Sequence, residues 1–296
     1  MGEKRKVLSV VGCGRTGRTL SRLFNQNRIF DIGPVLNRTV ESSERALAFV
    51  ESGSIAHSQK DVCTAEVIMI SVPDDQISSA AQDLASGGCL KQGTVVFHLS
   101  GFCSSKVLEP LAECGCETAS VHPVRSFADP GQSSRTFQGT PCAVEGTSSA
   151  LAVLNEAFRG IGGEVFSIRA DAKPLYHSAT VFLSNYVVAL LQSACKVLER
   201  TGMSEKDIQK VTGALAPQAV RNFLCFGADG ALTGPVARGD IDTIRKEIGA
   251  LVEYDKLASD LYRNLGLSAL TIAERSGSLS SAQINSITQL FKSAQV

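Results

Sequence analysis

The sequence predicts two domains, an α/β domain built on a doubly wound parallel sheet and an all-helical domain after it. Three observations lead to this prediction. An apolar strand near the N-terminus runs directly into a glycine-rich turn and a helix. Strand-like and helical runs then alternate up to residue 168, which is typical of a parallel sheet with helices on both faces. From residue 169 only helical periods follow, so we expect an α/β domain over residues 1–168 and a helical domain over residues 169–296.

The first strand, over residues 7–11, ends in Gly-Cys-Gly-Arg-Thr-Gly and continues into an amphipathic helix. This G-x-G-x-x-G pattern between strand and helix is typical of a Rossmann-type dinucleotide site. The first glycine permits the tight turn, the second lets the backbone approach a pyrophosphate, and the third lets the helix pack on the strand. A glycine-rich turn without a ligand is the alternative. The residues expected to contact the cofactor here are Gly12, Cys13, Gly14, Arg15, Thr16 and Gly17.

The second strand, expected over residues 30–36, ends in Asn37, Arg38 and Thr39, where a Rossmann-type domain binds the adenosine ribose. An acidic residue at this point would accept a hydrogen bond from a free 2′-hydroxyl. Arg38 instead offers a cation suited to a 2′-phosphate, flanked by two side chains that form hydrogen bonds. The segment therefore favours NADP(H) over NAD, the alternative being that Arg38 lies in an ordinary surface turn.

Five further strands and four helices complete the expected α/β domain. The strands are predicted at 65–72, 94–99, 117–122, 141–145 and 164–168, and the helices at 41–51, 76–85, 104–114 and 148–160. Ligands of an open α/β sheet bind beyond the carboxyl ends of its strands. His98, inside an apolar strand, is expected to be a structural residue. The residues that follow the strands are candidates for cofactor contact (Ser71, Val72, Pro73 and Ser100) and for substrate contact (His122 and Ser126).

The helical domain is expected to contain helices over residues 171–199, 204–226, 240–265 and 280–293. In the first of these, Lys173, His177 and Asn185 recur at multiples of four residues and share one helix face. Hydride delivery to a carbonyl leaves negative charge on oxygen, which needs an electropositive neighbour and a proton. We predict that Lys173 supplies the field, His177 the proton and Asn185 an orienting hydrogen bond. A solvated first turn followed by interhelical packing is the alternative.

A turn-rich segment over residues 231–240 contains a single arginine, Arg238. A guanidinium can bind both oxygens of a carboxylate, so Arg238 is a candidate anchor for a substrate carboxylate, or it pairs locally with Asp240. Asn222, in the preceding helix, is a further candidate for substrate contact.

Composition argues against two classes of partner. The chain has 296 residues, with 29 Lys and Arg against 29 Asp and Glu, so its formal net charge is zero. Nucleic acids and acidic membranes attract proteins with a basic excess, so neither is expected to bind. Glycines interrupt the apolar run near the N-terminus at once, which argues against a signal peptide, and no other stretch is expected to reach the length of a membrane span.

Cysteine and histidine usage points to the cytoplasm and away from a metal. The nine cysteines are scattered without a C-x-x-C pair, which is typical of a reducing compartment. The four histidines, at positions 57, 98, 122 and 177, show no metal-ligand spacing beside the cysteines. We therefore expect a cytoplasmic protein without a metal site.

The whole pattern resembles a bacterial two-domain family that joins a Rossmann-like NADP-binding domain to a helical domain of unassigned function. The resemblance spans nearly the whole chain and is most specific at residues 233–240. It is carried by the glycine loop at 12–17, His98-Leu-Ser-Gly, His122-Pro with Ser126-Phe, Tyr176-His177 with Asn185, and Leu-Thr-Gly-Pro-Val-Ala-Arg-Gly-Asp at 232–240.

This family is similar to the 6-phosphogluconate and β-hydroxyacid dehydrogenase superfamily, and some members resemble an alternative ketopantoate reductase of coenzyme A biosynthesis. The superfamily's Lys-x-x-x-Asn pair is not reproduced, because His177 follows Lys173 by four residues. The resemblance implies a homodimer packed through the helical domains.

The predicted function is NADP(H)-dependent transfer of hydride to a small 2-oxo acid that carries a carboxylate, with 2-dehydropantoate (ketopantoate) as the named candidate. A dehydrogenase of the prephenate or arogenate type is one alternative, because it has a similar His-Pro after the corresponding strand. A redox sensor that binds NADP without turnover is the other.

Overall fold

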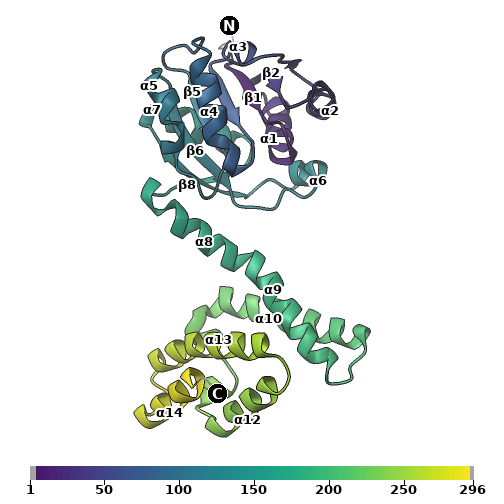
Figure 1. Cartoon of the computed structure of the whole chain (residues 1–296), viewed down its shortest axis with the longest axis vertical. Coiled ribbons are helices and arrows are strands. Elements are labelled where there is room, and N and C mark those ends of the chain that lie inside the picture. The colour runs from purple at the N-terminus through teal and green to yellow at the C-terminus, as the bar shows by residue number, and fades with distance from the viewer. Residues whose placement is uncertain (1–4, 294–296) are drawn as a thin grey trace. The chain divides into compact units, whose positions relative to one another are not determined.

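The computed structural model describes residues 5–293 and divides into two compact units, residues 1–181 and residues 182–296. The first unit holds the whole sheet and the second is helical (Figure 1). The predicted fold class, a Rossmann-type α/β domain followed by an all-helical region, is confirmed. The division between the compact units lies within a helix, α8 (Lys173–Leu183), whereas the sequence changes its period near residue 169.

The sheet has eight strands in the order β3-β2-β1-β4-β5-β6-β7-β8. Strands β1 to β6 are parallel, β7 is antiparallel to β6, and β8 is parallel to β7. The short β3 was not expected, because two residues carry no readable period. The chain order reverses between β1 and β4, which is where open α/β sheets bind ligands. The bounds are β1 Val7–Val11, β2 Asp31–Leu36, β3 Ser54–Ile55, β4 Val67–Ile70, β5 Val95–His98, β6 Glu117–Pro123, β7 Pro141–Gly146 and β8 Glu164–Ser167.

Helices cover both faces of the sheet because its strands are apolar on both sides. Along β4, Val67 and Met69 belong to one hydrophobic cluster, while Ile68 and Ile70 belong to another. The first cluster is closed by α1 (Arg15–Gln26), α2 (Val40–Val50) and α7 (Ser148–Gly160). The second is closed by α3 (Gln59–Val62), α4 (Ile77–Ser86) and α5 (Glu109–Glu113). A short α6 (Pro130–Arg135) completes the helices before α8.

The second unit contains six helical elements after the end of α8 among the residues that the structure describes, and the longest of them is broken at Gly227, whose φ is +69°. Its core joins α11 to α14 through Val236, Ile244, Leu270 and Phe291 with two further isoleucines. The bounds are α9 Asn185–Glu199, α10 Glu205–Ala231, α11 Pro235–Arg238, α12 Ile241–Val252, α13 Lys256–Arg275 and α14 Ser281–Lys292.

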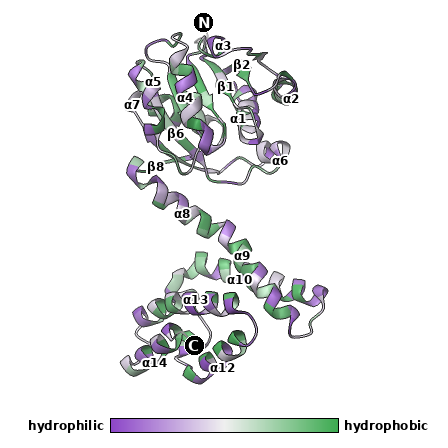
Figure 2. Cartoon of the chain, viewed as in Figure 1, coloured by the Kyte–Doolittle hydropathy of each residue, from purple (hydrophilic) through white to green (hydrophobic). Residues whose placement is uncertain are grey.

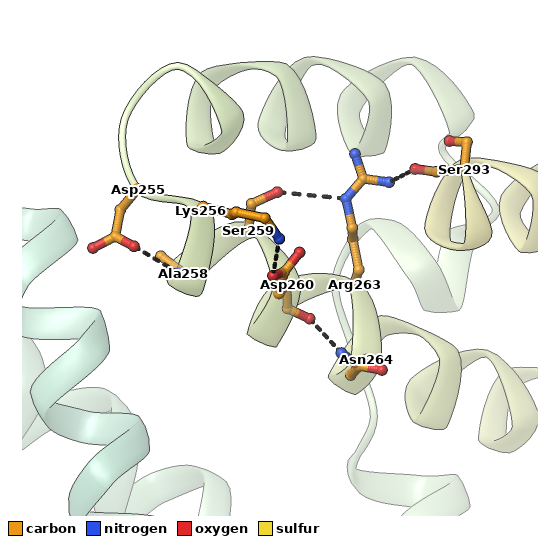
Figure 3. A network of polar contacts seen from close by, with 8 residues as sticks. All are labelled: Asp255, Lys256, Ala258, Ser259, Asp260, Arg263, Asn264 and Ser293. Carbon is orange, nitrogen blue, oxygen red and sulfur yellow. Dashed lines mark hydrogen bonds and ion pairs between the residues drawn. The ribbon is translucent and has the colours of Figure 1, made fainter. Parts of the chain in front are cut away.

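A buried arginine ties α13 to the end of α14 (Figure 3). Arg263 is 8% exposed and donates to the carbonyl oxygens of Leu290 at 2.8 Å and Ser293 at 2.6 Å. Its Nε donates to Ser259 Oγ at 3.4 Å. These carbonyls are the ones that a helix C-terminus leaves without partners, so Arg263 stabilises the end of α14.

Two predicted helices and one predicted turn-rich segment differ from the structure. The helix expected at 240–265 is two helices, because the chain leaves α12 at Glu253 and Asp255 caps α13 by accepting from Ala258 N at 3.1 Å. The helix expected at 171–199 is interrupted at Ser184, whose backbone dihedral angles are −127° and −77°. The segment at 231–240 contains the short helix α11 within its turns.

The helical stretch Ala170–Glu199 corrects one expectation from the sequence. It is 30 residues long, has a mean hydropathy of 1.5 over its most apolar window, and none of that window is buried. The expectation that no stretch reaches the length of a membrane span is therefore wrong by length and composition. Figure 2 shows hydrophobic residues along α8, α9 and α10. Exposed apolar side chains in the second unit include Phe182, Leu183, Tyr186, Val188, Phe223, Leu224 and Phe226.

Candidate functional site

The glycine loop after β1 has three different steric situations, one for each glycine. Gly12 has a φ of +81°, and a Cβ on it would lie 2.4 Å from Val72 Cγ1. A Cβ on Gly17 would lie 3.1 Å from Gly12 O, where α1 packs on the strand ends. A Cβ on Gly14 would meet nothing within 4 Å. The turn and the packing thus require Gly12 and Gly17, and open space lies beside Gly14.

The start of α1 is free to bind an anion. Gly14 is its N-cap residue, no side chain caps the helix, and its first turn contains no acidic residue. The unpaired N–H groups and the helix dipole together favour a phosphate at such a terminus.

Asn37 joins the glycine loop to the end of β2. Its Oδ1 accepts a hydrogen bond from Cys13 N at 2.6 Å. Its Nδ2 is buried and has no hydrogen-bond partner. A buried amide donor without a partner costs free energy, so this N–H₂ group is available to a ligand.

A cavity of about 370 Å³ lies in front of this loop. Arg38, predicted from the sequence, and Arg45, from α2, give the cavity two cations. Sequence reasoning missed Arg45, although Ser42 and Arg45 follow Thr39 at steps of three along α2 and thus share its face. The predicted Cys13, Arg15, Thr16, Gly17 and Ser100 are not in the lining. The lining residues are Gly12, Gly14, Asn37, Arg38, Thr39, Ser42, Arg45, Ser71, Val72, Pro73 and Gln76.

Lys173, at the start of α8, is fully buried in the first unit. Its Nζ donates to Ser100 O and to Ser120 Oγ, each at 2.5 Å. Burial lowers the pKa of Lys173 to about 8, against the opposing field of the Glu145 carboxylate. Glu145 is Ser120's partner across the β6–β7 ladder, and it accepts from Ser105 N and Ser105 Oγ at 2.7 Å each. Lys173 therefore anchors the first turn of α8 to the strand ends.

His98 is held on both ring nitrogens, which confirms the expectation that it is structural. Nδ1 accepts from Ser100 N at 3.2 Å, and Nε2 lies 3.2 Å from Ser104 O, a carbonyl that can only accept. Burial, and then the charge of Lys173, lower the pKa of His98 to about 4. The ring is therefore neutral at neutral pH and supports the loop that carries Ser100.

A cluster of aromatic and imidazole rings lies beside Gly101. His122 Nδ1 and Tyr176 Oη are 2.9 Å apart, and the His122 ring meets the rings of Tyr176 and His177 edge-on, at centroid distances of 5.7 and 6.4 Å. His177 Nδ1 is buried without a hydrogen-bond partner. Burial, and then the fields of Lys173 and His177, lower the pKa of His122 to about 4, and burial raises that of Tyr176 to about 12. Sequence reasoning gave Tyr176 no role of its own.

The other predicted site residues are more exposed. Ser126 is exposed on the loop after β6. Asn185, Asn222 and Arg238 belong to the second unit, where Asn185 Oδ1 accepts from Ser184 Oγ at 2.9 Å. Because the helix is interrupted at Ser184, the four-residue stripe does not continue unbroken from His177 to Asn185.

Arg238 is exposed at the end of α11, close to the next helix cap. Asp240 caps α12 by accepting from Thr243 N at 3.1 Å and Thr243 Oγ1 at 2.8 Å. These hydrogen bonds lower the pKa of Asp240, and the nearby Arg238 adds a smaller effect of the same sign. Within residues 5–293 no cluster of three or more His, Cys, Asp or Glu side chains could hold a metal ion.

Two family models match the chain, one in each half. Residues 1–123 match the family model of a Rossmann-like domain, and residues 140–269 match that of a domain of unknown function, DUF2520. Each match covers less than half of the chain, and the two follow each other in the order expected, a Rossmann-like segment and then a segment similar to DUF2520. The resemblance to a family of this two-domain organisation is confirmed. No curated protein matches the chain.

Solved structures share this fold over nearly their whole length. A protein from Thermotoga maritima is 26% identical with a TM-score of 0.70, covering 90% of this chain and 98% of its own. A candidate NADP oxidoreductase from Bacteroides fragilis is 20% identical with the same TM-score and the same coverage of 90% and 98%. An imine reductase from a Pseudomonas species is 16% identical with a TM-score of 0.65, covering 98% and 99%.

Proposed function

We propose that the protein is an NADP(H)-dependent oxidoreductase that transfers hydride to the C=O or C=N carbon of a small carboxylate-bearing substrate. The observation that carries this proposal is the cavity at the glycine loop, where the uncapped start of α1 and two arginines converge. The names of the similar structures, an NADP oxidoreductase and an imine reductase, support the same class of chemistry.

The residues present fit a phosphorylated dinucleotide. The open space at Gly14 leaves room for a pyrophosphate against the first turn of α1. Arg38 and Arg45 supply charge for a 2′-phosphate, and the unpartnered Asn37 Nδ2 supplies a donor. The bound nicotinamide would supply the hydride. The chain's own residues bind and orient it and provide the proton.

The roles predicted for the catalytic residues need one refinement. The Lys173 ammonium group is fully buried and donates to Ser100 and Ser120. We therefore assign Lys173 a positioning role, in which it holds the loop at Gly101 and the first turn of α8 in place. His177 stays a proposed site residue because its Nδ1 lacks a partner. Asn185, Asn222, Ser126 and Arg238 stay predictions for substrate contact.

The substrate is best identified by a panel assay that follows loss of NADPH absorbance. The panel should hold 2-oxo acids including ketopantoate, cyclic imines with and without a carboxylate, and, for the reverse reaction with NADP⁺, prephenate and arogenate. We expect turnover with a carboxylate-bearing oxo acid or imine. Exclusive turnover of prephenate or arogenate would assign the dehydrogenase alternative. Tight NADPH binding with no turnover of any compound would assign the redox-sensing alternative.

We also propose that the protein is a cytoplasmic homodimer that packs through the apolar side chains of α9 and α10. The exposed fractions are 54% for Tyr186, 55% for Phe223 and 76% for Leu224. A soluble monomer rarely exposes several large apolar side chains in one patch. All nine cysteines are free thiols, in keeping with a reducing compartment. Neither nucleic acid nor a membrane is proposed as a partner.

A further inference from the structure

The helical unit has a cavity of its own, of about 390 Å³, at the start of α13 and the end of α14. We refer to it as the α13–α14 cavity. Every residue that lines it belongs to the second unit, and none of them lines the cavity at the glycine loop. Its volume lies in the lower part of the range for small-molecule sites, which is roughly 300–1,000 Å³. The α13–α14 cavity is therefore large enough for a small ligand.

The charged residues that line the α13–α14 cavity are mostly basic. Lys256, Arg263 and Lys292 each carry one positive charge, and Asp260 is the only acidic residue among the described lining residues. The lining thus has a formal charge of +2, although the whole chain has a net charge of zero. The positive end of the α13 dipole lies at the same place, because Lys256 is the first residue of that helix. This concentration of positive charge favours an anionic ligand.

Arg263 has a hydrogen-bond donor left for such a ligand. It is only 8% exposed, its Nη1 donates to the carbonyl oxygens of Leu290 and Ser293, and its Nε donates to Ser259 Oγ. Its Nη2 forms no hydrogen bond with the residues that the structure describes, as Figure 3 shows. A buried guanidinium N–H group without an acceptor is costly. Because the other two nitrogens already hold the side chain in place, Nη2 is a preorganised donor in the cavity.

The two lysines of the lining are available to a ligand as well. Lys292 is exposed and forms no hydrogen bond or ion pair with the described residues. Lys256 Nζ lies 2.6 Å from Asp260 Oδ2, but the two side chains are 88% and 50% exposed. An ion pair this exposed contributes little free energy, so the contact of Lys256 with Asp260 is exchanged at small cost for one with a ligand anion.

We propose that the α13–α14 cavity binds a small organic dianion, a phosphate ester or a dicarboxylate, as a second ligand of this protein. Arg263 Nη2 donates to one ligand oxygen, and Lys256 and Lys292 neutralise the charge. Val252 and Phe291 supply an apolar part of the lining for the carbon atoms of the ligand. Because Arg263 also holds the carbonyls at the end of α14, the bound anion fixes that end against α13. The proposal is independent of the proposed function, since no residue of the glycine loop takes part.

The first test follows the Nε–H signal of Arg263 by NMR in the whole protein without dinucleotide. Inorganic phosphate and succinate are titrated separately, each against sodium chloride of equal ionic strength. We expect a saturable change in the millimolar range. A response to phosphate alone assigns a phosphate ester, and a response to succinate alone assigns a dicarboxylate. No change with either anion, or the same change with chloride, would overturn the proposal.

This readout separates the proposal from the proposed function. Phosphate bound at the start of α1 has no contact with Arg263, because that residue does not line the cavity at the glycine loop. Failure of NADPH to bind would contradict the proposed function and leave the Arg263 signal as a valid measure of the α13–α14 cavity.

The second test removes the lysines, which support no contact that the fold needs. Lys292→Gln should weaken phosphate binding by about twofold to tenfold, because an exposed charge contributes modestly to a contact. The double variant Lys256→Gln with Lys292→Gln should weaken it further, and phosphate should raise its Tm by less than it raises that of the wild type. Lys246→Gln, an exposed lysine of α12 outside the cavity, is the matched control and should bind as the wild type does. Unchanged affinity in the double variant would contradict the proposal.

The third test replaces the guanidinium. Arg263→Lys keeps the positive charge but loses the planar fork that binds an oxyanion, so phosphate affinity in the folded variant should fall by about tenfold. Circular dichroism measures whether the variant is folded, because Arg263 also stabilises the end of α14. Wild-type affinity in a folded Arg263→Lys protein would contradict the assigned contact. If this variant does not fold, the lysine double variant decides.

Discussion

At the scale of single residues, burial decides the charge states around Gly101. His98 and His122 are neutral at neutral pH because burial and the Lys173 charge both lower their pKa values. Lys173 keeps a counter-charge in Glu145, which is buried and held by Ser105. The strand ends therefore carry one buried cation, one buried anion and two neutral rings.

His98 gives stability a specific pH dependence. Its pKa is about 4 in the folded chain and near 6.5 when unfolded, so its contribution is complete above pH 6.5 and is lost as pH falls through 4. One pKa unit corresponds to about 1.4 kcal/mol, so His98 alone should contribute on the order of 3 kcal/mol to this loss. Chemical denaturation between pH 7 and pH 4 should show a shallower decline in His98→Gln than in the wild type. Parallel curves for the two proteins would contradict this assignment.

The positions of Arg38 and Arg45 in the cavity predict that NADPH binds more tightly than NADH. A charge-assisted hydrogen bond contributes about 1.5–3 kcal/mol, so Arg38→Gln or Arg45→Gln should weaken NADPH binding by about 10-fold to 100-fold. NADH has no 2′-phosphate, so its affinity should not change. Titration calorimetry measures both constants, and Arg159→Gln on α7 is the control for a general loss of positive charge. Equal losses for NADPH and NADH would place the arginines away from the 2′-phosphate.

At the scale of elements, two glycines of the glycine loop have different expected roles. We expect Gly12 to be needed for folding and Gly14 to be needed for binding the dinucleotide. Gly12→Ala forces an L side chain to a φ of +81° and against Val72, so it should destabilise the first unit by about 2 to 4 kcal/mol. Gly14→Ala meets open space and should cost less than about 1 kcal/mol, yet its methyl group should lower dinucleotide affinity at least tenfold. Denaturation and titration of both variants test this pair. Equal stability losses in the two variants would show that the loop geometry is wrong.

Elements that depend on local sequence patterns could be predicted, whereas breaks inside an apolar helical period could not. The glycine loop and the predicted strands depend on local patterns, and all are found in the structure. Asp255 is the kind of residue that caps a helix, yet the apolar period on both sides of it hid the break before α13. The interruption at Ser184 has no glycine or proline to mark it.

Tertiary contacts account for the site features that sequence reasoning missed. The ammonium group of Lys173 can be buried since it donates a hydrogen bond to Ser120, which lies more than fifty residues earlier in the chain. The pairing of Tyr176 with His122 also joins residues far apart in the chain. Arg45 was detectable, since its spacing from Thr39 places it on the same side of α2.

At the scale of the whole molecule, the exposed apolar residues of α9 and α10 predict association. A dimer should form at micromolar concentration, and Leu224→Asp should shift it towards monomer because a charge in an apolar interface is costly. Val40→Asp, which changes a 45% exposed apolar residue of the first unit, should stay dimeric. Analytical ultracentrifugation measures the masses. A monomeric wild type that co-sediments with neutral lipid vesicles would instead favour a membrane surface for this stretch.

We propose above all that the cavity at the glycine loop binds a phosphorylated dinucleotide. Titration calorimetry of the wild-type protein with NADPH and NADH tests it most directly. We predict one NADPH per chain, bound at least about tenfold more tightly than NADH, because the 2′-phosphate meets Arg38 and Arg45. Absence of binding for both dinucleotides, or equal affinity for the two, would contradict the claim.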